Sequence, residues 1–191
     1  MAKTAPPIDH QGTPVNRPGF HIFGNVDVCD QATVSQWAQA EGNILIAGDA
    51  QVYGQAWVGD FAQVTQEAQV YDSATVSDAA WVYGSARIYG KARISGQARV
   101  RGHVHVSGDA QVYGQALVQN NARISGNAEV GYQSIVSGEA IVDGNAQIKG
   151  KAVVDGKSHI GGTAILLGGI WLDTDVFEGT WHSPPNSGNK A

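Results

Sequence analysis

The stretch GDAQVYGQALVQNNARISGNAEVG, residues 108–131, shows the pattern that decides the fold. It consists of four six-residue units with Gly or Asn first, Ala third and Val or Ile fifth. From Pro18 to Asp173 the chain divides into 26 such hexads without an insertion. The fifth residue is apolar in all 26, the third is Ala in 19, and the first is Gly in 17. An internal repeat of this length indicates a repeat architecture.

Each position of the hexad has a physical role. Side chains alternate along an extended strand, so the third and fifth residues face the same way and offer one small and one β-branched residue to a core. The sixth, first and second residues turn a corner, where Gly, Asp and Asn tolerate left-handed backbone. A strand this short cannot bury its face alone, so the hexads must wind into coils that stack.

Composition excludes several other classes of protein. The 191 residues suit one domain or one repeat array, and only 15% are charged, against about 25% in an average soluble protein. Five Leu and one Met are too few for an all-α fold. The lone Cys29 excludes a disulfide framework and favours a reducing compartment, so we expect a cytoplasmic protein.

Nothing in the sequence predicts contact with a membrane or with nucleic acid. The first 17 residues lack the apolar core of a signal peptide, and no apolar run approaches the roughly 18 residues of a membrane span. The net charge of -5 argues against nonspecific binding of DNA or a membrane by the whole surface.

The pattern G-x-A-x-V-x resembles the hexapeptide-repeat superfamily over 156 of the 191 residues. The resemblance implies an all-β fold: a single-stranded left-handed parallel β-helix with three hexads per coil and about eight to nine coils. Residues 1–17 would then be an N-terminal extension or cap, 18–173 the β-helix, and 174–191 a C-terminal cap and flexible tail. The resemblance also implies a homotrimer with subunits packed side by side.

With three hexads per coil, the outward fourth positions of every third hexad form columns. One column ends in four apolar residues, Leu117, Ile135, Val153 and Trp171. A continuous apolar stripe of this kind predicts the oligomer interface. The alternative is that Val176, Phe177 and Trp181 of the tail fold back over it.

A second column places Arg87, His105 and Arg123 on one face, with His103 and Tyr89 beside it. Guanidinium groups bind phosphate or carboxylate bidentately, and an aromatic ring offers a surface to a ligand, so these five residues predict an anion site.

The charges along the chain are unevenly distributed. Residues 18–86 contain eight acidic residues and no Lys or Arg, whereas six cations lie between Arg87 and Arg123. The alternative to an anion site is therefore a solvated basic belt that pairs with acids of its own or a neighbouring subunit.

Two functions fit these features, and a third fits them poorly. The array has no extruded loops, and function concentrates in loops, so we expect a noncatalytic binding or structural module without a cofactor. The alternative is an acyltransferase resembling members of the superfamily, with His105 or, in reserve, His159 as general base, and acyl-CoA or an acyl carrier as co-substrate. A γ-class carbonic anhydrase is the weakest option, because His103, His105 and His159 lack its ligand spacing, and we expect no metal site.

Overall fold

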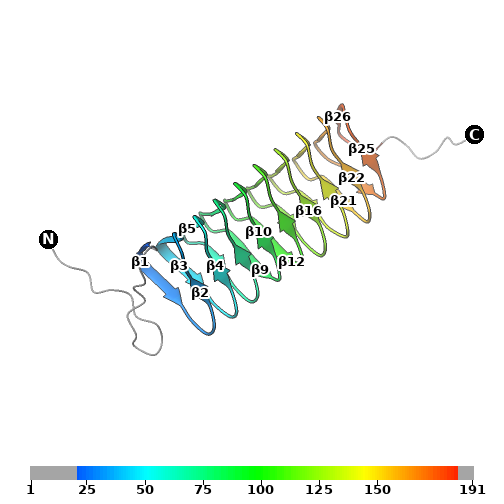
Figure 1. Ribbon diagram of the computed structural model, residues 1–191. Helices are drawn as coiled ribbons and strands as arrows, with labels where there is room; N and C mark the ends of the chain where they lie inside the picture. The colour runs from blue at the N-terminus through cyan, green and yellow to red at the C-terminus, as the bar shows by residue number, and fades with distance from the viewer. Residues whose placement is uncertain (1–20, 185–191) are drawn as a thin grey trace, which may run out of the picture.

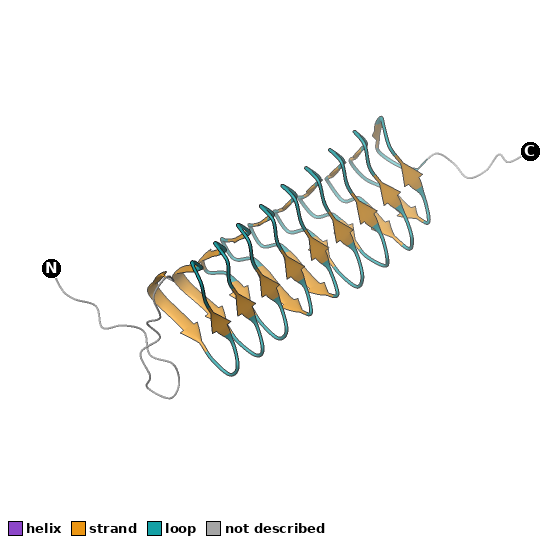
Figure 2. Cartoon of the chain, in the orientation of Figure 1, coloured by secondary structure: helices purple, strands orange, loops and turns teal. Residues whose placement is uncertain are grey.

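The backbone winds into a stack of parallel turns, each hydrogen-bonded to the turn before and the turn after (Figure 1). The computed structural model describes residues 21–184, so the predicted N-terminal extension, 1–17, and the end of the tail, 185–191, lie outside the described residues. Strand partners are three hexads apart, as in Arg87 with His105, through most of the stack. All regular structure from 21 to 184 is β (Figure 2). This part of the chain contains no helix long and apolar enough to cross a membrane.

One face of the stack is a nine-stranded parallel sheet that contributes one strand to each of about nine turns. Its strands are β2 (Thr33–Val34), β4 (Gln51–Val52), β7 (Gln69–Val70), β10 (Arg87–Ile88), β13 (His105–Val106), β16 (Arg123–Ile124), β19 (Ile141–Val142), β22 (His159–Ile160) and β25 (Asp175–Val176).

The other two faces form a single 17-stranded sheet. Strands β1 (His21–Val28) and β3 (Gln39–Ile46) join the faces, because they run through a corner at Gly24 and Gly42. One face continues with β5 (Trp57–Asp60), β8 (Thr75–Val76), β11 (Arg93–Ile94), β14 (Gln111–Val112), β17 (Glu129–Val130), β20 (Gln147–Ile148), β23 (Ile165–Leu166) and β26 (Thr180–Trp181). The other continues with β6 (Gln63–Val64), β9 (Trp81–Gly84), β12 (Arg99–Gly102), β15 (Leu117–Val118), β18 (Ile135–Val136), β21 (Val153–Asp155) and β24 (Ile170–Leu172).

The core lies along the axis of the stack and consists of the third and fifth residues of the hexads. Ala80 and Val82 are typical of these residues and are fully buried. Ser134 and Ser158 replace Ala at two third positions, and each buried hydroxyl donates to a backbone carbonyl at 2.8 Å. A buried polar group is tolerated only when it is hydrogen-bonded in this way.

The corners explain the Gly content and four of the eight acidic residues between 18 and 86. The first residue of almost every described hexad has positive φ, which Gly adopts without strain. At six corners without Gly, an Asp or Gln side chain accepts a hydrogen bond from the backbone N–H of the corner in the next turn. Asp72 accepts from Gly90 at 3.1 Å, and Gln66 from Gly84 at 2.9 Å. Asp30, Asp60 and Asp78 do the same, so these acids are structural.

The regular hexad ends at Leu166, earlier than the sequence predicts. The next core residues are Trp171, Val176 and Trp181, which follow at steps of five. Trp171 is fully buried, and its indole N–H donates to the Gly168 carbonyl at 2.8 Å. The prediction that Trp171 is an outward rung is therefore wrong: Val153 pairs with Ile170, which is 68% exposed, and Val154 pairs with Trp171.

The stack also continues past Asp173. Strands β25 and β26 pair with β22 and β23, and Val176 lies in the core. Phe177 packs edge-on against the His159 ring with centroids 4.9 Å apart. The described part of the tail extends the stack and does not fold back over the apolar stripe. At this end the core residues therefore follow at steps of five instead of six, and two of the three are Trp.

The corner geometry predicts different outcomes for two substitutions of Gly108, which has φ +70°. A Cβ at this position would lie 2.8 Å from the Gly126 carbonyl oxygen. Gly108→Ala should therefore lower the free energy of unfolding by about 1–3 kcal/mol. Gly108→Asp should lower the free energy of unfolding by only about 0.5–1.5 kcal/mol. Its carboxylate can accept a hydrogen bond from the Gly126 N–H, as Asp72 does from Gly90.

Denaturant unfolding followed by circular dichroism measures both variants. An Asp variant no more stable than the Ala variant would contradict this role of the corner carboxylates.

Candidate functional site

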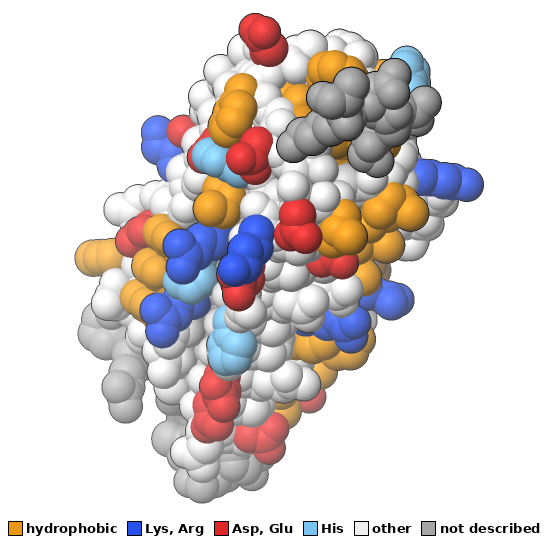
Figure 3. Space-filling view, turned by 90° about the vertical axis from the view of Figure 1, so that its right-hand side faces the viewer, with side chains coloured by type: hydrophobic (Ala, Val, Ile, Leu, Met, Phe, Trp, Pro, Cys, Tyr) orange, Lys and Arg blue, Asp and Glu red, His pale blue; other side chains and the backbone are white. Residues whose placement is uncertain are grey.

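The strand register aligns the basic residues of the nine-stranded sheet. Arg87 pairs with His105, and His105 pairs with Arg123, so the three side chains lie in consecutive turns about 4.8 Å apart. Space-filling colours show blue Lys and Arg beside pale-blue His on part of the surface (Figure 3). The register thus brings together three of the five residues that the sequence predicts for an anion site.

A hollow of about 440 Å³ adjoins this column on one side. Two rows of side chains line it: a corner row and the strand row beside it. The lining residues are His103, Asn121 and Glu139 in the corner row and His105, Arg123 and Ile141 in the strand row. Sequence reasoning found His103, His105 and Arg123 and missed the other three, although the column through His103, taken every third hexad, contains Asn121 and Glu139.

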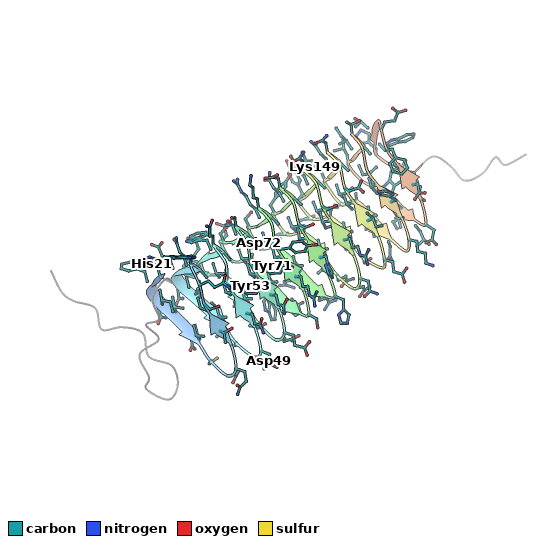
Figure 4. All side chains as sticks on the ribbon, in the orientation of Figure 1. His21, Asp49, Tyr53, Tyr71, Asp72 and Lys149 are labelled. Atoms are coloured by element: carbon teal, nitrogen blue, oxygen red, sulfur yellow. The ribbon has the colours of Figure 1, made fainter. Side chains whose placement is uncertain are left out.

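Tyr89 lies on the opposite side of the column, in a stack of three tyrosines. The ring centroids of Tyr53 and Tyr71 are 5.0 Å apart, and those of Tyr71 and Tyr89 are 5.1 Å apart, with the planes nearly parallel. Tyr53 and Tyr71 lie in neighbouring turns in Figure 4. The Tyr89 ring meets the His105 ring edge-on at 6.3 Å. Tyr89 therefore supports His105 from the side away from the hollow.

His105 has a lowered pKa. Partial burial is the largest cause, followed by the charges of Arg87 and Arg123 and then by His103. The imidazole is therefore neutral at pH 7 and offers one N–H donor and one acceptor nitrogen. The positive charge of this face comes from the two guanidinium groups.

The belt cations have no acidic partner within the described part of the chain. The two ion pairs in residues 21–184 are Lys149 with Glu129, at 3.0 Å, and His159 with Asp143, at 2.8 Å. Arg101 bonds instead to the Gln119 amide oxygen at 2.6 and 3.0 Å. Among residues 21–184, the belt cations therefore do not pair with acidic residues of their own subunit.

The catalytic candidates have different surroundings. Among the described hydrogen bonds, none joins His105 to a carboxylate, whereas His159 Nε2 lies 2.8 Å from Asp143 Oδ2. Asp143 is a partner that the sequence did not reveal, because it lies in a corner position 16 residues before His159.

Burial, and then Asp27 and Asp30, raise the pKa of the Cys29 thiol, which disfavours the nucleophilic thiolate.

The three histidines considered as zinc ligands do not converge. The register His105, Arg123, Ile141, His159 separates His105 from His159 by three turns. Within residues 21–184, no group of three or more His, Cys, Asp or Glu side chains could hold a metal ion.

The apolar stripe is present in a modified form. Leu117 pairs with Ile135, and Ile135 with Val153, and all three side chains are half-buried. Ile170 replaces Trp171 as the next rung, because the register shifts by one residue there.

A family model described as the YdcK beta solenoid repeat matches residues 68–84 and 110–126. The chain is built from β-solenoid repeats. Each match is one residue short of a full turn and begins with AQVY. The matches cover less than half of the chain and support the β-solenoid, while the hexapeptide-repeat superfamily stays a prediction. A search of curated proteins gives no match.

The surroundings of His105 predict how its titration responds to charge. Arg123→Gln should raise the pKa of His105 towards the ordinary value, though not fully, because burial is the largest cause of the shift. With the folded pKa below the unfolded one, this histidine stabilises the fold above the unfolded pKa of about 6.5 and loses that contribution as the pH falls through the folded value. Arg123→Gln should weaken this acid sensitivity.

An NMR titration of the His105 ring protons measures the change. Arg93→Gln, which removes the same charge from another face, is the matched control and should leave His105 unmoved. If Arg123→Gln and Arg93→Gln changed the pKa of His105 equally, the charge effect on His105 would not come from its neighbour Arg123.

Proposed function

We propose that this β-solenoid is a noncatalytic binding module that holds a phosphate- or carboxylate-bearing small ligand on the face of Arg87, His105 and Arg123. One observation carries the proposal. Two guanidinium groups without an acidic partner among the described residues flank a neutral histidine beside a hollow. An anion bound there would offset the repulsion between the two like charges.

The donors of this face suit one anionic group. A guanidinium presents parallel N–H donors that match two oxygens of a phosphate or carboxylate. His105 and the Asn121 amide can each add a hydrogen bond. Glu139 lines the same hollow, where its carboxylate would repel a second anion and accept a hydrogen bond from a hydroxyl or ammonium group. The ligand class is therefore a single anionic headgroup, phosphate or carboxylate, with a hydrogen-bond donor close by.

A homotrimer is part of the proposal and is supported by the column Leu117, Ile135, Val153 and Ile170. Burial of four such side chains contributes at most about 6–12 kcal/mol. Association costs about 4–15 kcal/mol, so neighbouring polar contacts must contribute as well.

Isothermal titration calorimetry with O-phosphoethanolamine and with inorganic phosphate tests the anion site. Arg87→Gln and Arg123→Gln should each weaken binding by about tenfold or more, because each loses charge-assisted hydrogen bonds worth roughly 1.5–3 kcal/mol. Arg93→Gln, on another face, is the control and should bind as the original chain does. Glu139→Gln should reduce the preference for O-phosphoethanolamine over phosphate.

No heat of binding at millimolar ligand, or equal losses in all three arginine variants, would contradict the proposal. Sedimentation velocity on the same samples gives the assembly state.

A further inference from the structure

Tyr132 is the exception among the corner residues. It occupies a first hexad position with φ 61°, and every other non-Gly residue of positive φ between 21 and 184 is Asp, Asn or Gln. Asp and Asn tolerate this conformation, and Gln36 and Gln66 bond the backbone of the next corner, whereas a bulky aromatic side chain is strained there. The ring is also 58% exposed, so burial does not compensate for the strain. Strained residues of this kind concentrate at functional sites.

The turns on either side of Tyr132 leave space around its ring. Gly114 and Gly150 occupy the same corner in the preceding and following turns and carry no side chain. Lys149, labelled in Figure 4, marks this corner of the stack. The result is a hollow of about 400 Å³ between the glycines, lined by Gly114, Gln115, Tyr132, Gln133, Gly150 and Lys151. The hollow is wide open to solvent, so a ligand would lie across it rather than inside it.

A second aromatic ring supports the first. Tyr113 lies edge-on to Tyr132, with centroids 5.9 Å apart and planes at 61°. Gly131 makes room for it, because a Cβ at that position would collide with the Tyr113 ring. Glu129 lies close to Tyr113 and is paired with Lys149 at 3.0 Å, so charged side chains surround this second ring. Tyr132 is therefore a positioned ring on the surface.

Amide side chains run beside the ring in register. Gln133 Nε2 donates to Gln115 Oε1 at 3.3 Å, and Gln115 Nε2 donates to Gln97 Oε1 at 3.4 Å. Each amide keeps a further donor hydrogen and acceptor lone pair for another molecule. Lys151 follows Gln133 in the same column and adds one cation at the edge of the hollow.

We propose that this corner binds a saccharide. The C–H face of a sugar ring packs on the electron-rich face of Tyr132. Hydroxyl groups both donate and accept, as do the amides of Gln115 and Gln133. Lys151 favours a sugar that carries a carboxylate. The site is on a different edge of the stack from the Arg87 column, so it does not depend on the anion site.

Tyr132→Gly separates binding from folding, because it restores the residue found at this corner in both neighbouring turns. The probes are tri-galacturonate, which is acidic, and cellotriose, which is neutral, observed by saturation-transfer NMR and titration calorimetry. The unmodified chain should bind tri-galacturonate more tightly than cellotriose. Tyr132→Gly should weaken both by about tenfold or more and should unfold at the same or a higher denaturant concentration. Tyr132→Phe should keep binding.

Gln66→Gly is the matched control, since it removes another corner exception far from the hollow and should leave saccharide binding unchanged. Three outcomes would overturn the proposal: no saturation transfer to either saccharide, undiminished binding by Tyr132→Gly, or a change in assembly mass on Tyr132→Gly. The last would make the ring a subunit contact.

Discussion

The hydrogen bond between a backbone N–H of one turn and a carbonyl of the next is the interaction on which the rest of the structure depends. Thr33 N–H bonds to the Ala50 carbonyl at 2.9 Å, and the same step repeats turn after turn. To keep it, the chain must turn a corner every six residues without spreading the turns apart, which requires positive φ and a small or hydrogen-bonding side chain. Gly108 satisfies both requirements because it has no side chain. Asp72 satisfies them because its carboxylate accepts a hydrogen bond from the Gly90 N–H in the next turn.

This constraint also determines what the outer surface can do. Because the strands pair in a fixed register, residues three hexads apart in the sequence lie in one column, about 4.8 Å from each other. Arg87, His105 and Arg123 form one such column and the Gln97, Gln115, Gln133 amides another. Both proposed sites lie on this scaffold rather than on loops, and the hollow at Tyr132 arises where a large residue stands between Gly114 and Gly150. Tyr132 departs from the corner rule, at a cost in backbone strain.

The repeat predicted the parallel coils and the buried third and fifth positions. The family resemblance, and not the period itself, supplied the three hexads per coil that pair Arg87 with His105. The repeat failed at Trp171, because Leu172 also satisfies a six-residue count and only packing shows that the larger ring fills the core. It missed Asn121, Glu139 and Ile141, because a hollow depends on how far the side chains of two neighbouring columns project from the backbone, and the repeat does not predict this. It placed Asp72 and its equivalents at the corners for their tolerance of left-handed backbone, but their hydrogen bonds with the backbone of the next turn become visible only in the structure.

Disulfide cross-linking between turns tests the register most directly. In a Cys29→Ser background, paired Arg93→Cys and Gln111→Cys substitutions place two thiols on adjacent rungs of β11 and β14. Their Cα atoms, about 4.8 Å apart, fit disulfide geometry. The account predicts rapid oxidation of this pair and none within a monomer for Arg93→Cys with Leu117→Cys, which lies four hexads on and on another face. Cross-linking of 93 with 117 and not with 111 would contradict the turn of three hexads and the columns built on it.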